Sequence, residues 1–131
     1  MSFADMIQTA DWKGEKHVPV IDAPEHVEAG QPFDVTITVG KEVPHPNTTE
    51  HFIAWIDLYF KPSNGKFAFH VGHADFRAHG ESVKGPNQGP VFAAPKATFA
   101  MTLSQSGTLV ATSLCNIHGL WESSQDIAVG S

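Results

Sequence analysis

Cysteine is nearly absent from this sequence, which contains only Cys115. One cysteine excludes an intramolecular disulfide framework and any zinc or iron site built from four thiolates of the same chain. A chain without disulfides is suited to a reducing compartment, so we expect the protein to be cytoplasmic. Cys115 then needs a role of its own.

Basic residues are also few, because eight Lys and Arg stand against fourteen Asp and Glu, giving a formal net charge of −6. No basic stripe is available to neutralise a run of phosphates, so we expect no nucleic-acid partner. An anionic membrane would repel the chain as well. Apolar runs are too short for a membrane span, and Asp5 lies where a signal peptide would carry positive charge.

The apolar content is sufficient for one core, since 41% of the 131 residues are hydrophobic and 10% are aromatic. We therefore expect a single domain over residues 1–131. Glycine and proline are scattered between short apolar runs, as is typical of a β-rich domain. Residues 33–39 alternate apolar and polar side chains and predict a strand with one buried face.

The run 52–60 predicts a strand covered on both sides, with Ile56 on one face and Ile53 and Asp57 on the other. Further strands are expected at 66–73, 97–103 and 108–115, with 126–129 as another candidate, and a brief helix over 3–9. Five to seven antiparallel strands with turn signals between them predict an all-β sandwich of about seven strands with a short N-terminal helix.

Eight histidines are many for a chain of this length, and their spacing separates candidate ligands from background. Cys115 and His118 form a C-x-x-H pair at the predicted end of a strand, where a tight loop could direct both side chains at one ion. Taken alone, the pair fits a buried cysteine beside a surface histidine equally well.

Three more histidines lie where loops meet predicted strands. His45 and His51 bracket the turn-forming segment HPNTTEH, which should bring the two imidazoles back toward each other. His17 precedes the apolar run 18–21. Each of these histidines, taken alone, fits a solvated loop residue better than a ligand.

Together, four imidazoles and one thiolate discriminate between metals. Structural zinc is normally satisfied by four ligands, so it would leave one candidate unused. Five ligands suit an ion with one open position, and imidazole with thiolate is compatible with iron or copper. A blue-copper site usually has a methionine after its last histidine, and the last methionine, Met101, precedes Cys115. An oxygen-radical reductase, an electron carrier and a zinc-stabilised structural domain all stay open at this point.

The segments EKHVPVI, HPNTTEHFIAWIDLYF and CNIHGLWES resemble the three metal-site segments of superoxide reductases of the neelaredoxin type, in the desulfoferrodoxin superfamily. The resemblance spans nearly the whole chain. Two-iron relatives carry an additional N-terminal domain with a four-cysteine iron centre, for which this sequence has neither the cysteines nor the room. It therefore resembles the one-iron class.

The resemblance implies an immunoglobulin-like sandwich that holds one mononuclear non-haem iron, cycling between Fe²⁺ and Fe³⁺, per chain. It implies four equatorial histidines and an axial thiolate opposite an open position, namely His17, His45, His51, His118 and Cys115. It further implies one-electron reduction of superoxide to hydrogen peroxide, re-reduction by rubredoxin or a similar small iron protein, and a homotetramer.

Glu15 and Lys16 match a loop that lies over the open position in relatives. The resemblance implies that the Glu15 carboxylate is able to occupy that position when the iron is ferric. Lys16 is expected to focus the superoxide anion toward the site and to orient a proton-donating water. Backbone amides of residues 116–118 are expected to hydrogen-bond to the Cys115 sulfur.

The remaining histidines are expected to be background. On a strand, His70 and His73 have opposite parity and should face opposite ways, which argues against their joint ligation of a second metal. His79 and His26 have no candidate role. Trp121 is expected to form a wall of the metal pocket.

Overall fold

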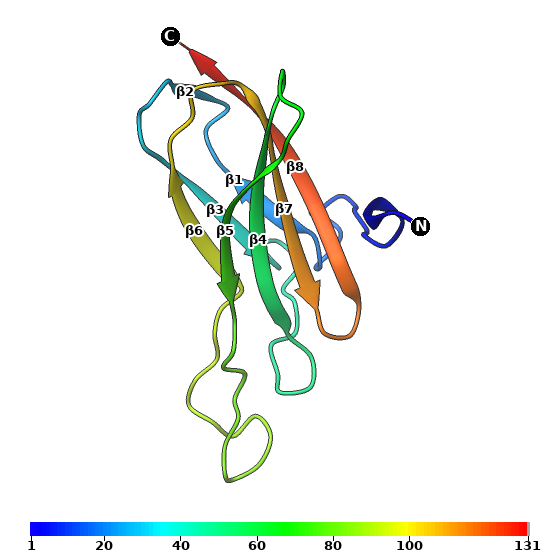
Figure 1. Cartoon of the computed structure of the whole chain (residues 1–131). Helices are drawn as coiled ribbons and strands as arrows, with labels where there is room; N and C mark the ends of the chain where they lie inside the picture. The colour runs from blue at the N-terminus through cyan, green and yellow to red at the C-terminus, as the bar shows by residue number, and fades with distance from the viewer. Residues whose placement is uncertain (131) are drawn as a thin grey trace.

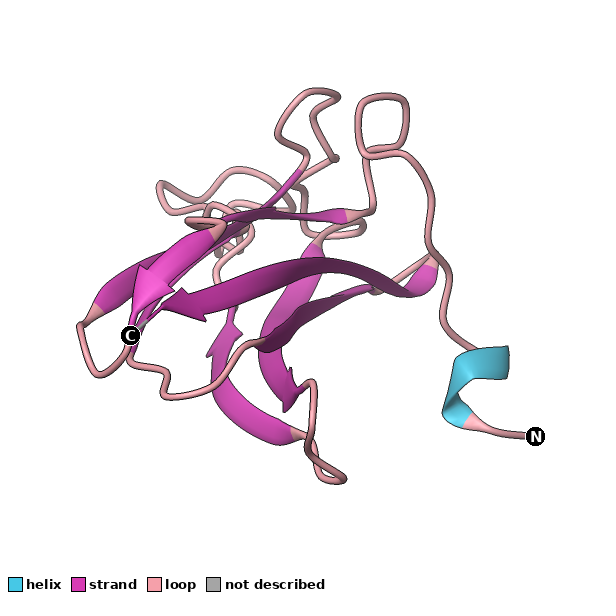
Figure 2. Cartoon of the chain, turned by 90° about the horizontal axis from the view of Figure 1, so that it is seen from above, coloured by secondary structure: helices cyan, strands magenta, loops and turns pink. Residues whose placement is uncertain are grey.

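The computed structural model describes residues 1–130 and contains two sheets packed face to face (Figures 1 and 2). One sheet has the strand order β1-β3-β6 and the other β2-β8-β7-β4-β5. The strands are β1 (Pro19–Asp22), β2 (His26–Glu28), β3 (Phe33–Val39), β4 (Ile53–Pro62), β5 (Phe69–Asp75), β6 (Lys96–Met101), β7 (Gly107–Cys115) and β8 (Gly119–Gly130). The all-β prediction is confirmed.

The core between the sheets follows from the alternation in the strands. Val35, Ile37 and Val39 of β3 all face inward and are buried, as the period-two pattern predicts. They pack in one cluster with Leu58 of β4 and Leu109 of β7, both completely buried. Each such side chain stabilises the fold by about 1.5–3 kcal/mol, and together they hold the two sheets against each other.

The elements differ from the prediction at β2, over most of β8 and at the expected N-terminal helix. The described residues contain eight strands where about seven were expected, because the three-residue strand β2 was missed, and β2 pairs parallel, not antiparallel, with β8. The predicted helix over residues 3–9 is reduced to a 3-10 turn, η1 (Phe3–Asp5), which Figure 2 shows outside the two layers. No helix among residues 1–130 is long and apolar enough to cross a bilayer.

Irregular pairing changes which way some side chains of β4 face. A register shift between Ile53 and Trp55 turns Ile53 into the same core cluster as Ile56, although the alternation had placed the two on opposite faces. Ile56 and Leu58 also face the core and are completely buried. A bulge inserts an extra residue into a strand and so breaks the period of two locally.

A second register shift, between Leu58 and Tyr59, affects β5 in the same way. As a result, His70 and His73 do not face opposite ways, and that prediction is wrong. His70 Nε2 lies 2.8 Å and His73 Nδ1 lies 2.7 Å from the same atom, Asp57 Oδ1. The two histidines therefore share one carboxylate on the outer face of the larger sheet.

The loops after β3, β5 and β7 gather at one end of the sandwich (Figure 1). At this end Cys115, the last residue of β7, pairs with Ile53, the first residue of β4. The β3–β4 loop and the turn after β7 are therefore neighbours, although they are far apart in sequence.

Candidate metal centre

Four side chains of the predicted set offer donor atoms that all lie within 4.8 Å of one another. These are His17, His45, His51 and Cys115. They come from the segment before β1, from the β3–β4 loop and from the end of β7. Because all but His51 are buried, the cluster is built into the protein and is not a chance encounter of surface groups.

His118 lies against the same cluster. Its Nδ1 is 3.2 Å from His17 Nε2 and 3.8 Å from Cys115 Sγ, so the structure brings all five predicted ligands together. His118 is exposed, which places it on the solvent side. Gly119 has a positive φ of 82°, a conformation that glycine adopts without strain, and this lets the chain turn directly from His118 into β8.

Two imidazoles carry ring nitrogens that are buried without a partner. Among residues 1–130, Nε2 of His45 and Nε2 of His51 have no hydrogen bond. A buried polar atom without a partner costs about 1–3 kcal/mol, so these nitrogens need an explanation. His45 Nδ1 donates to the carbonyl oxygen of Pro46 at 2.6 Å, which leaves the lone pair on Nε2. Unpaired imidazole nitrogens beside a thiol fit a single transition-metal ion.

Glu15 lies behind His17. Its Oε1 accepts hydrogen bonds from His17 Nδ1 at 2.6 Å and from the His17 backbone N–H at 3.0 Å. This carboxylate fixes the tautomer that leaves the Nε2 lone pair facing the cluster, while the Trp121 ring stacks on the imidazole at 4.9 Å. Burial alone would raise the pKa of Glu15, but the hydrogen bonds from His17 hold that pKa below its usual value.

Two histidines of the cluster, His45 and His51, have lowered pKa values, which favours the neutral form that metal ligation requires. Burial lowers the pKa of His45 to about 4, and the charges of His17, His51 and Lys16 add to this effect against the bond to Pro46. Burial also lowers the pKa of His51, again with a contribution from Lys16. The Lys16 ammonium is therefore close enough to act on both rings.

The turn that follows Cys115 supports the thiol and ties two loops together. The His118 backbone N–H donates to Cys115 Sγ at 3.3 Å, which confirms the expected backbone bond for that residue. Asn116 Oδ1 accepts the Phe52 N–H at 2.9 Å, and Asn116 Nδ2 donates to the Glu50 carbonyl oxygen at 2.8 Å. Sequence reasoning missed this role of Asn116, because an asparagine in a turn carries no signal of a distant partner.

Comparison with known proteins identifies the family of this chain. The family model described as desulfoferrodoxin matches residues 9–124. The chain belongs to the desulfoferrodoxin family. The resemblance seen in its three histidine-bearing segments is thereby confirmed.

The relatives in this family match over nearly their whole length. The chain is 55% identical to the protein named neelaredoxin of Megalodesulfovibrio gigas, covering 98% of this chain and 99% of that one. It is 52% identical to the superoxide reductase of Pyrococcus furiosus, with 91% and 94% covered. The solved structure of the superoxide reductase (neelaredoxin) of Archaeoglobus fulgidus in the reduced form aligns with a TM-score of 0.88 at 53% identity, covering 94% of this chain and 98% of that one.

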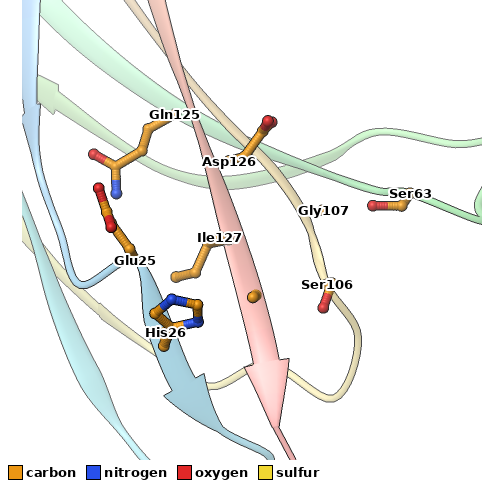
Figure 3. Close-up of a pocket in the computed structure, with 9 residues that line it drawn as sticks. Glu25, His26, Ser63, Ser106, Gly107, Gln125, Asp126 and Ile127 are labelled. Atoms are coloured by element: carbon orange, nitrogen blue, oxygen red, sulfur yellow. The ribbon is translucent and has the colours of Figure 1, made fainter.

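A pocket of about 570 Å³ lies away from the metal-ligand cluster of this desulfoferrodoxin-family chain. Figure 3 shows Glu25 and His26 beside Gln125 of β8 in this pocket. Gly107 also lines it, and Gly107 and Cys115 are the two ends of β7. Nine strand residues span roughly 25–30 Å, so the pocket and the metal-ligand cluster lie at opposite ends of the sandwich.

Proposed function

We propose that this protein is a superoxide reductase that reduces superoxide to hydrogen peroxide at one non-haem iron per chain. The iron would be held by His17, His45, His51, His118 and Cys115. The observation that carries the proposal is the preformed cluster of four imidazoles and one thiol, two of whose buried nitrogens have no hydrogen-bond partner among residues 1–130. The names of the two relatives and of the solved structure support it.

When bound, the iron would supply the single electron that superoxide needs, cycling between Fe²⁺ and Fe³⁺. Four neutral imidazoles and one thiolate contribute only one negative charge. The loaded site therefore stays cationic in both states and attracts a small anion even though the whole chain carries −6. The product needs two protons, which we propose are delivered by water, since the exposed His118 gives this side of the cluster contact with solvent.

Lys16 and Glu15 have different roles in the proposed reaction. The Lys16 ammonium, which acts on both His45 and His51, focuses superoxide toward the cluster and orients the water that delivers a proton. The Glu15 carboxylate holds His17 in the conformation described above. We propose that the same carboxylate would serve as a further ligand of the oxidised iron, in place of its hydrogen bond to His17 Nδ1.

Absorption spectroscopy tests the metal and its ligands together. The oxidised protein should show a red-region charge-transfer band from thiolate to ferric iron that bleaches with dithionite, and Cys115→Ser should lack it. A colourless protein that contains zinc would overturn the proposal in favour of a structural site. Stoichiometry then tests the reaction, because a reductase forms one hydrogen peroxide per superoxide and a dismutase forms one per two.

The proposal also covers the setting of the enzyme. We place one iron-binding domain over residues 1–131, in an immunoglobulin-like sandwich, and a cytoplasmic location that suits the single unpaired Cys115. We also propose a homotetramer, re-reduced by rubredoxin or a similar small iron protein. Light scattering of the purified protein checks the tetramer, and reduction of the oxidised protein by rubredoxin checks the donor.

A further inference from the structure

His79 is a buried histidine that lies outside the metal-ligand set. It sits in the long connection between β5 and β6, and only 3% of its surface is exposed. A polar ring buried to this degree needs partners, and sequence reasoning had treated it as background.

Both ring nitrogens of His79 have hydrogen-bond partners, and one face of the ring packs on an aromatic side chain. Its Nε2 lies 2.7 Å from the carbonyl oxygen of Phe76, and its Nδ1 lies 3.1 Å from Oδ1 of Asn47. One face of the ring stacks on the Phe52 ring, with centroids 3.9 Å apart and planes inclined by 14°. His79 therefore joins its own connection to two residues of the β3–β4 loop.

Asn47 and Phe52 occupy special places in that loop. Asn47 lies two residues after His45, and Phe52 directly follows His51. Asn47 Nδ2 also donates to the carbonyl oxygen of Ala93 at 3.0 Å, so both ends of the amide are engaged with the β5–β6 connection. The loop that carries two of the five metal donors is thus held near each donor by a contact with His79.

Phe52 also connects His79 to the turn that follows Cys115. The Phe52 backbone N–H donates to Asn116 Oδ1, and the Asn116 backbone N–H donates to the Phe52 carbonyl oxygen at 3.2 Å. Asn116 is the residue after Cys115. His79 contacts the Phe52 side chain, and Asn116 holds the Phe52 backbone. Both contacts therefore act on the residue that directly follows His51.

We propose that His79 is a positioning residue of the metal centre, which holds the β3–β4 loop so that Nε2 of His45 and of His51 face the ion. This inference rests on the proposed function only in assuming that the cluster binds a metal. Residues that orient ligands typically change metal affinity 10- to 100-fold when they are replaced. We therefore expect His79→Leu to weaken metal binding about ten-fold, which corresponds to about 1.4 kcal/mol.

The test is an anaerobic titration of the metal-free protein with Co²⁺, followed through the thiolate-to-cobalt absorption of Cys115. His79→Leu should bind about ten-fold more weakly, and His79→Gln, whose amide can replace one of the two hydrogen bonds, should bind with intermediate affinity. His26→Leu is the matched control, because His26 is exposed at the far end of the sandwich. Ile37→Val, a core change in the other sheet, controls for general destabilisation.

Wild-type metal affinity in His79→Leu would overturn the proposal. It would also be overturned if Ile37→Val, at the same thermal stability as His79→Leu, lost metal affinity equally. If His79→Leu does not fold, Asn47→Ala removes the same link from the loop side. The double variant Asn47→Ala/His79→Gln should then lose less affinity than the sum of the two single losses, because the two changes affect the same His79–Asn47 hydrogen bond. Fully additive losses would contradict the shared role. Cobalt binding requires no superoxide, so failure of the reductase proposal would leave this result interpretable.

Discussion

Lys16 is the residue proposed above to focus an incoming anion on the metal-ligand cluster. If it steers superoxide, Lys16→Ala should slow capture by about ten-fold at low ionic strength, at the lower end of the range for electrostatic steering. The salt dependence of the rate should flatten, because the screened interaction has been removed. Pulse radiolysis at several salt concentrations measures both effects. Iron content should not change, and an unchanged capture rate would eliminate the steering role.

Glu15 fixes the orientation of His17 from behind, which makes a different prediction. Glu15→Ala leaves His17 Nδ1 without its carboxylate and should weaken metal binding by about ten-fold. The ferric absorption spectrum should also change, because water or another anion would fill the open position. Glu15→Gln keeps an acceptor for Nδ1 and should restore the affinity but not the ferric spectrum. Identical spectra in all three proteins would argue against Glu15 as a ligand.

His45 predicts how the metal-free protein responds to acid. Its pKa falls from 6.5 to about 4 on folding, so the unfolded chain binds a proton that the folded chain does not. Stability should therefore decrease as the pH falls from about 6.5 to about 4, by on the order of 3 kcal/mol. Urea unfolding at several pH values measures this loss. His45→Gln should flatten the curve in that window, and an unaltered slope would contradict the assignment.

At the scale of single elements, the bulge in β5 brings His70 and His73 to the same carboxylate, Asp57. The effect of pH on stability there is opposite to that expected for His45. Hydrogen bonds to Asp57 and Asp75 raise the pKa of His73 above 6.5. The resulting stabilisation is fully present below pH 6.5 and is lost as the pH rises through the folded pKa. It should be small, because the His73 side chain is 39% exposed and solvent screens the pair.

Thermal unfolding at low salt between pH 6 and pH 8.5 tests this cluster. The wild-type midpoint should fall slightly with rising pH, and His73→Gln should remove that part of the dependence. His26→Gln serves as the control, since His26 is exposed on β2. A decline of equal size in wild type and His73→Gln would show that other groups produce it.

The elements also show what sequence patterns can and cannot predict. The alternation in β3 predicted its buried face, and the spacing of the histidines predicted which side chains would meet. Most of β8 was missed because its inward positions include polar side chains. Ser123 Oγ donates to the Pro19 carbonyl oxygen, and Gln125 Nε2 donates to that of Ala23. Such partners, like the bulges and the contacts of His79, depend on strand pairing that no local pattern encodes.

At the scale of the whole molecule, one ion would join parts of the chain that are far apart in sequence. His17 and His118, whose ring nitrogens are 3.2 Å apart, are separated by 101 residues. Binding to the folded state alone stabilises it by about 2.7 kcal/mol at a hundred-fold excess of metal over the dissociation constant. Removing the metal with a chelator should therefore lower the thermal midpoint by several degrees. An unchanged midpoint would show that the ion adds no stability.

The chain has no disulfide, so the loops at the metal-binding end of the sandwich have no permanent crosslink. A bound ion would reversibly crosslink the segment before β1, the β3–β4 loop and the turn after β7. In a living cell, the lifetime of the protein against proteases would then follow the supply of its metal. Molecules made during iron shortage would be degraded first, and the molecules that survive would be those that already contain the metal.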